Sequence, residues 1–249
     1  MKQDITNKAQ TEVLDFPVYN QGLEQLDLSK KTLINTINQY SYIVTKKDDA
    51  FKKALAESDI LLPDGIGITL ASKFLTGRSI QKIAGADLHK HLLEKLDREK
   101  GSCFYLGASE STLEKIKARV NKEYPGISVG SYSPPFKKEF TEADNNRMIE
   151  MVNRFSPDVL FVGMTAPKQE KWAHAHKASL NATIICSIGA VFDFYAGTVK
   201  RPHQFWIKMG LEWFVRLFNE PKRMWKRYLY YGPLFAYILV NKKFQQIQK

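Results

Sequence analysis

The chain alternates short apolar runs, rich in β-branched and aromatic residues, with longer stretches whose apolar residues recur every three or four positions. The apolar runs predict strands over residues 32–37, 60–62, 102–106, 127–132, 159–163 and 183–188. The longer stretches predict helices over residues 40–56 (with a polar break at 46–49), 66–76, 86–99, 112–123, 144–155 and 169–178. This alternation predicts βαβ units, and hence an α/β fold with a mostly parallel sheet and helices on both faces.

The size and composition of the chain are those of a folded protein with a core. Its 249 residues are 44% apolar, which is too apolar for disorder throughout. The opening residues, Met1 to Asp4, are polar, so we expect no secretory signal. Cys103 and Cys186 lie inside two predicted strands, which indicates reduced core cysteines of a cytoplasmic protein. Two cysteines, and five histidines without ligand spacing, also argue against a zinc site.

The net charge of +11 is concentrated at the C-terminal end of the chain. Residues 196–249 contain eleven Lys and Arg against two acidic residues, a net charge of +9, together with twelve of the thirty aromatic residues. We therefore divide the chain into a body, residues 1–199, and a helical, basic appendage, residues 200–249. Such an appendage predicts an anionic partner, and the candidates are a membrane surface, a nucleic acid and a phosphorylated ligand.

Two helices are predicted in the appendage, over residues 204–218 and around Pro221. Residues 228–240 are uncharged and mostly apolar, but Gly232-Pro233 interrupts them and a bilayer-spanning helix needs about twenty apolar residues. They therefore predict a segment that lies at an interface or packs against a partner.

Polar residues follow the predicted strands at the points where the strands end. They are Asn38, Asp64, residues 107–109, residues 165–169 and residues 189–190. Ligands of open α/β sheets bind beyond the carboxyl ends of the strands, so this edge is the expected site. The same residue types also cap helices and form turns, and Asp64 taken alone favours a cap for the helix that follows it.

Several nucleotide-binding and metal-binding patterns are missing from the sequence. Gly65 and Gly67 begin a G-x-G-x-x-G fingerprint, but Leu70 stands at its third glycine. The sequence contains no G-K-[ST] phosphate loop, no G-x-S-x-G elbow and no D-x-D metal clamp. An enzyme on this fold would have to neutralise phosphate with Lys, Arg and backbone N–H groups.

Arginines of the appendage could provide such charges. Arg216, Arg223 and Arg227 are seven and four positions apart, so they would share one face of a continuous helix. The simpler interpretation of this face is a solvated surface that only raises solubility. The many aromatic residues around it argue that part of the appendage is buried against the body, a partner or lipid.

Six segments, in order along the chain, resemble motifs of one protein family. They are TINQYS (36–41), LPDGIGI (62–68), KIAGADL (82–88), GMTAPKQEKW (163–172), GAVFDFYAGTVKRP (189–202) and LEWFVRLFNEPKRMWKRYL (211–229). From about residue 12 to residue 230, the sequence resembles the WecG/TagA/CpsF family of bacterial glycosyltransferases, which is glycosyltransferase family 26. The resemblance implies a Rossmann-like α/β core of the GT-E type, with an appendage that binds the membrane and completes the active site.

The resemblance also implies a reaction. Such enzymes are inverting, metal-independent transferases that move a sugar from a UDP-sugar to a polyprenyl-diphosphate-linked saccharide, for wall, capsule or exopolysaccharide synthesis. The protein would then need no cofactor and would lie on the inner face of the bacterial plasma membrane, in contact with its anionic surface. The appendage would close over the pocket at the membrane or in a homo-oligomer. The donor sugar is left open.

Four residues of the body carry roles that the resemblance implies. Asp64 matches the general base, and Thr36 and Asn38 match pocket residues near it. Gln169 matches the glutamine of a P-x-Q-E motif. Thr36, Asn38 and Gln169 are expected to hydrogen-bond the hydroxyl groups or an N-acetyl group of the sugar.

Four cationic residues complete the predicted site. Arg216 and Arg223 match appendage arginines that face the diphosphate, and Arg227 would be a third. Lys82 stands where the family has Arg, which keeps the positive charge but loses the two-pronged guanidinium. With no metal, these cations would stabilise the leaving nucleoside diphosphate.

Three other classes of function are weighed against this hypothesis. A basic nucleic-acid-binding protein would use the appendage, but it would leave the motifs of the body without a role, so we expect no nucleic-acid partner. Another nucleotide-binding Rossmann protein, such as a nicotinamide-dependent oxidoreductase, would need the missing glycine fingerprint. A binding protein without activity would not need Asp64.

Overall fold

Six strands form one parallel sheet in the computed structural model, which describes residues 9–199, 203, 205–206, 212–219, 221 and 225–248. The strands are β3 (Thr32–Ile37), β4 (Ile60–Pro63), β5 (Ser102–Gly107), β6 (Ser128–Tyr132), β7 (Val159–Gly163) and β8 (Ile184–Ser187). They lie in the order β4-β3-β8-β7-β5-β6, and every neighbouring pair is parallel. Each strand end lies within one residue of its prediction, which confirms the α/β class and the parallel, Rossmann-like sheet.

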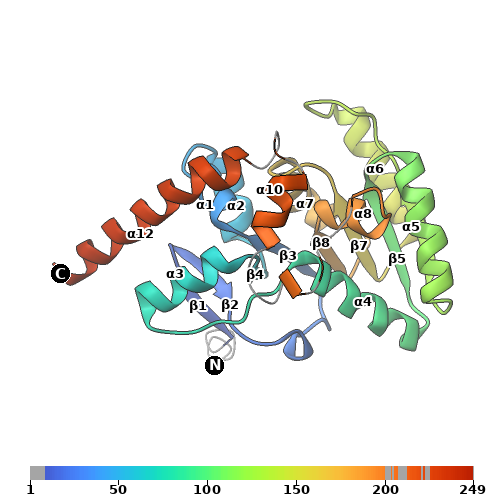
Figure 1. The fold of residues 1–249 in the computed structure, drawn as a ribbon. Coiled ribbons are helices and arrows are strands. Elements are labelled where there is room, and N and C mark those ends of the chain that lie inside the picture. The colour runs from blue at the N-terminus through green and yellow to red at the C-terminus, as the bar shows by residue number, and fades with distance from the viewer. Residues whose placement is uncertain are drawn as a thin grey trace, which may run out of the picture.

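Helices cover both faces of the sheet (Figure 1). In the body they are α1 (Gln39–Val44), α2 (Asp49–Ala56), α3 (Ile66–Thr76), α4 (Gly85–Glu99), α5 (Glu110–Glu123), α6 (Glu142–Phe155), α7 (Lys168–His176) and α8 (Ala190–Tyr195), with short 3₁₀ turns at Leu23–Gln25 and Lys177–Ser179. The break after α1 is as predicted, because Asp48 caps α2 through the N–H of Phe51 at 2.9 Å. α5 and α6 begin two residues before their predicted starts, since Ser109 and Thr141 are the caps.

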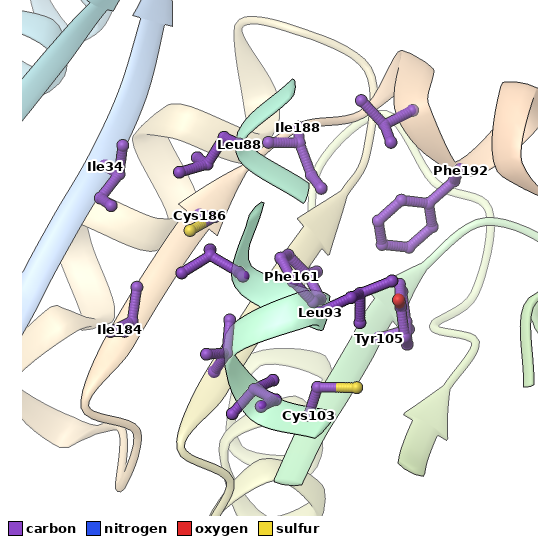
Figure 2. Packing of buried hydrophobic residues seen from close by; sticks show 14 of the residues in the cluster. Ile34, Leu88, Leu93, Cys103, Tyr105, Phe161, Ile184, Cys186, Ile188 and Phe192 are labelled. Atoms are coloured by element: carbon purple, nitrogen blue, oxygen red, sulfur yellow. The ribbon is translucent and has the colours of Figure 1, made fainter. Parts of the chain in front are cut away.

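One face of the sheet packs against α4, α5 and α8. Leu93 of α4 and Phe192 of α8 lie over Tyr105 of β5 and Phe161 of β7, while Leu88 of α4 lies near Cys186 and Ile188 (Figure 2). These side chains are buried, so this face supplies a large part of the apolar area that stabilises the body. The sequence predicted no helix between the strand that ends at residue 188 and the end of the body, so α8 was missed.

Cys103 and Cys186 lie in the same cluster as free, fully buried thiols (Figure 2). Burial raises the pKa of the Cys103 thiol to about 12 and raises the pKa of the Cys186 thiol as well. Protonated, inaccessible thiols do not react readily. The prediction of reduced core cysteines is confirmed.

The opposite face packs against α6 and α7, where Val152 and Trp172 lie over Leu160. Beyond the β4 edge, a third cluster joins α1, α2 and α3 to an N-terminal hairpin of β1 (Gln10–Val13) and β2 (Phe16–Tyr19). This hairpin was not predicted. Its turn residues, Leu14 and Asp15, both have positive φ, which is the geometry of a turn usually built from Asn-Gly or Asp-Gly.

The appendage adds α10 (Glu212–Asn219) and a helix that passes from a π-helical turn (Lys226–Tyr230) into α12 (Tyr231–Ile247). α12 packs over α1 and α3, and Phe235 is buried with its ring 5.7 Å from that of Tyr42. Gly232 and Pro233 follow the π-helical turn and lie within α12, so they do not interrupt the helical segment. No helix in the described part of the chain is both long enough and apolar enough to cross a bilayer. The expected hinge at Arg201-Pro202 lies outside the described residues.

Candidate active site

The chain places Asp64 where three segments meet at the carboxyl edge of the sheet. Its backbone N–H donates to the carbonyl of Ile37 at 2.9 Å, which joins the end of β4 to the end of β3. The N–H of Ile83 donates to the carbonyl of Pro63, also at 2.9 Å, which brings the loop before α4 to the same point. Lys82 is the neighbour of Ile83, so the predicted base and the predicted body cation lie on adjoining segments.

Asp64 is half-buried and lies just outside the helix that follows it. The N-cap position of α3 is taken by Gly65, with φ at +95°. Asp64 therefore lies one residue before the N-cap position of α3. The first turn of α3 still favours a negative charge beside it, through the helix dipole.

The two glycines after Asp64 leave room for Gln39 of α1. A Cβ atom at Gly67 would lie 2.9 Å from Oε1 of Gln39, and one at Gly65 would lie 3.4 Å from the same atom. The glycines therefore allow α1 and α3 to begin side by side, with Asn38 and Asp64 just before them. The close approach is at Gly67, where a side chain would meet Gln39. Oε1 of Gln39 is buried without a hydrogen-bond partner among the described residues.

Thr36 and Asn38 lie on β3 and at the start of α1. Thr36 is opposite Leu62 in the parallel register, and strand alternation directs it to the face that carries Ile34 and α4. Asn38 caps α1, because its Oδ1 accepts from the N–H of Ser41 at 3.0 Å. The substrate role of Asn38, which stays a prediction, therefore concerns its Nδ2 amide.

Gln169 joins two loops at the carboxyl edge. Its Oε1 accepts from the N–H of Met164 at 3.1 Å and from the N–H of Gly189 at 3.2 Å, so it holds the loop after β7 to the loop after β8. Its Nε2 donates to Oε1 of Glu170 at 2.9 Å. The side chain is buried and its polar atoms are used in these bonds. Direct contact between Gln169 and a sugar stays a prediction.

Glu170 was not singled out from the sequence. It is almost completely buried, and burial raises the pKa of its carboxyl group to about 7. Its Oε2 has no hydrogen-bond partner among the residues that the structure describes. The sequence signal that could have found it is its place in the first turn of α7, directly after the glutamine of the P-x-Q-E motif.

The appendage reaches this edge through Arg227. Its guanidinium lies over the ring of Tyr40, 4.5 Å from the centroid, and Tyr40 also packs edge-to-face with Tyr231. Tyr40 follows Asn38 by two residues, so Arg227 lies beside the first turn of α1. Arg223 and the side chain of Arg216 lie outside the described residues.

This arrangement combines a carboxylate, two cations and several helix N-termini at one edge of a sheet. A carboxylate can accept a proton, while the cations and the N-termini favour bound phosphate. Among the described residues, no group of three His, Cys, Asp or Glu side chains could hold a metal ion. The metal independence of the chemistry stays a prediction.

Comparison with known proteins assigns this arrangement to a family. The chain is 33% identical over 205 residues to the N-acetylglucosaminyldiphosphoundecaprenol N-acetyl-beta-D-mannosaminyltransferase of Bacillus spizizenii, covering 82% of this chain and 77% of the relative. It is 31% identical over 204 residues to the enzyme of that name from Bacillus subtilis, with the same coverage. It is 24% identical over 251 residues to that from Staphylococcus aureus (strain MW2), covering 97% and 96%. The model of the Glycosyl transferase WecG/TagA/CpsF family matches residues 11–249, and the chain belongs to this family of glycosyltransferases.

Proposed function

We propose that the protein transfers N-acetylmannosamine from its UDP derivative to N-acetylglucosamine on a polyprenyl diphosphate, with inversion and without a metal ion, in cell-wall or exopolysaccharide synthesis. The names of its relatives support this acceptor and this sugar. The observation that carries the proposal is the half-buried Asp64, held between the ends of β3 and β4 and the loop that bears Lys82.

Asp64 acts as the general base in this proposal. A hydroxyl oxygen of the acceptor sugar attacks the anomeric carbon of the donor and forms the new glycosidic bond. The bond from that carbon to the diphosphate breaks, and the leaving UDP takes the electron pair. The hydroxyl proton passes to the carboxylate of Asp64, a step that contributes a factor of about 10²–10⁴ to the rate.

The cations of the site stabilise the leaving group. The diphosphate gains negative charge as the bond breaks, and cations already in position favour that change. Lys82 lies on the loop that contacts the end of β4, Arg227 lies over Tyr40 of α1, and Arg216 and Arg223 are proposed to join them. Thr36 and the Nδ2 amide of Asn38 are proposed to orient the sugar.

The test is the Asp64→Asn variant, assayed for UDP release from UDP-N-acetylmannosamine with a prenyl-diphosphate-linked N-acetylglucosamine acceptor. We expect kcat to fall by a factor of about 10²–10⁴, because Asn cannot accept the proton, with little change in KM. Asp27→Asn makes the same chemical change at an exposed carboxylate in the loop before β3, which lies at the amino ends of the strands. This variant should keep full activity. Turnover near that of the wild type by Asp64→Asn would refute the assignment.

A further inference from the structure

An apolar groove runs between α3 and α12, at the end of the molecule formed by β4. Its volume is about 590 Å³, and it is lined by Leu70, Lys73, Phe74, Ala236, Leu239 and Val240. Figure 1 shows the two helices side by side here, with α12 continuing past the body. Leu70, Phe74 and Val240 are 56%, 46% and 44% exposed, although all three are large apolar residues.

α3 has two apolar faces, and only one of them is covered by the body. Ile68 and Ala71 point into the cluster beneath the helix and are buried. Ile66, Leu70 and Phe74 are four positions apart and form an exposed stripe on another face. A helix on a protein surface normally presents polar residues to water, so a second apolar stripe indicates a binding surface.

The stripe begins beside the proposed base. Ile66 follows Asp64 by two residues, and with a rise of about 1.5 Å per residue the stripe extends about 12 Å from Ile66 to Phe74. In a prenyl-diphosphate-linked sugar, the sugar ring and the diphosphate separate the reacting hydroxyl from the hydrocarbon chain. When the hydroxyl lies at Asp64, the hydrocarbon chain begins some distance from Asp64. The groove also begins some distance from Asp64, so the two positions match.

Two cations flank the groove. Lys73 forms part of its wall, and Nζ of Lys243 lies 5.9 Å from the centroid of the Phe74 ring. Neither lysine has an acidic partner among the residues that the structure describes. Positive charge beside an apolar channel is complementary to a ligand with an anionic head and a hydrocarbon tail.

We propose that this groove binds the isoprenyl chain of the acceptor, so that the sugar lies at Asp64 and the hydrocarbon lies between α3 and α12. The inference depends on the proposed function, because it names the place where that substrate's lipid binds. A second copy of the chain and the general membrane surface are the two other occupants that the test must distinguish.

The experiment compares two acceptors with the same head group, N-acetylglucosaminyl diphosphate. One acceptor carries a farnesyl chain and the other carries an ethyl group. For the wild type we expect a KM at least tenfold lower with the farnesyl acceptor. Leu70→Gln and Val240→Gln should raise the farnesyl KM about tenfold and leave kcat and the ethyl KM unchanged. Phe136→Gln is the matched control, since Phe136 is fully exposed beyond β6, at the other edge of the sheet.

Equal KM values for the two acceptors in the wild type, or an equal loss with both acceptors in Leu70→Gln, would overturn the proposal. So would a wild-type dimer that Leu70→Gln converts to a monomer in light scattering, because a second copy would then cover the groove. Loss of binding to acceptor-free vesicles with an unchanged KM ratio would assign the groove to the membrane surface instead.

Calorimetric titration with farnesyl diphosphate and with inorganic diphosphate measures binding to the groove without any sugar transfer, so it tests the inference independently of the proposed reaction. Tighter binding of the farnesyl compound by the wild type, lost in Leu70→Gln, supports the groove even if no sugar is transferred. Equal binding of the two compounds refutes the groove. Absence of transfer by the wild type with either acceptor refutes the proposed function alone.

Discussion

Glu170 shows how one buried carboxyl group can control two loops. It accepts a hydrogen bond from Gln169, whose other end holds the loops after β7 and β8 together. Ionised Glu170 would leave its charged Oε2 buried with no hydrogen-bond partner among the described residues, whereas the protonated form is neutral. The protonation state of Glu170 is therefore coupled to the loops that border the site.

The prediction at this scale concerns Glu170→Gln, which mimics the protonated side chain. The pKa of Glu170 is about 7 in the folded protein and near 4.3 when unfolded, so the folded state binds more protons between these values. The stability of the wild type should therefore fall, relative to that of Glu170→Gln, as pH rises from about 4.5 to 7, by up to about 3 kcal/mol. Urea denaturation at a series of pH values measures this difference.

Glu139→Gln is the matched control, because Glu139 is an exposed carboxylate in the loop before α6. Its free energy of unfolding should follow that of the wild type across the same pH range. A stability difference between the wild type and Glu170→Gln that does not change with pH would mean that Glu170 is charged in the folded protein.

At the scale of elements, the loops at the carboxyl edge depend on backbones that approach each other closely. Gly107, at the end of β5, has a φ of +121°, and a Cβ atom there would lie 2.3 Å from the carbonyl oxygen of Gly163 at the end of β7. The N–H of Ala108 donates to that same carbonyl at 3.1 Å. The two strand ends are therefore held together by a contact that only glycine allows.

The prediction at this scale is that Gly107→Ala destabilises the protein severely, because both the positive φ and the backbone contact oppose a side chain. Two other glycines separate these causes. Gly77 also has a positive φ but has open space around it, so Gly77→Ala should cost only about 1–2 kcal/mol. Gly22→Ala, in open space with an ordinary φ, should be nearly neutral. Thermal melting of the three variants ranks their stabilities. Equal losses of stability for Gly107→Ala and Gly77→Ala would show that the contact with Gly163 is unimportant.

Short-range sequence patterns predicted the helices and strands whose structure depends mainly on neighbouring residues. The strands of the sheet and α3 follow from apolar periodicity, whereas α5 begins two residues before its predicted start, at the Ser109 cap. The β1–β2 hairpin was missed because its Leu14-Asp15 turn adopts positive φ without glycine or asparagine. Glu170 was missed because its burial depends on loops that are distant in sequence.

The candidate site was predictable to the same extent. The parallel sheet brings the ends of β3 and β4 together, and this places Asn38 beside Asp64 as expected. The capping of α1 by Asn38 and the joining of two loops by Gln169 could not be read from the sequence, because each depends on where a side-chain oxygen points.

At the scale of the whole molecule, exposed apolar residues gather on the appendage and on α3, and the appendage carries most of the net positive charge. Anionic lipids attract each nearby Lys or Arg by about 1 kcal/mol. The protein is therefore expected to bind vesicles that contain phosphatidylglycerol and to be released by salt, with little binding to phosphatidylcholine alone. A sedimentation assay at several salt concentrations measures both effects.

A pair of double variants makes this prediction specific to one face. Lys73→Gln/Lys243→Gln should weaken binding to anionic vesicles more than tenfold. Lys115→Gln/Lys122→Gln removes the same charge from α5, at the other end of the body, and should have a much smaller effect. Equal losses in the two double variants would show that only the net charge matters.

Arg227 and Phe235 belong to one helical segment, residues 225–247, that continues without a break. Phe235 holds this segment in the core, and Arg227 lies over Tyr40 at the edge of the site. In the proposed mechanism Arg227 would leave the site when Phe235 leaves the core, so only the fraction of molecules with α12 docked would turn over. A hydrocarbon chain bound between α3 and α12 would raise that fraction, and the lipid substrate would then activate the enzyme that uses it.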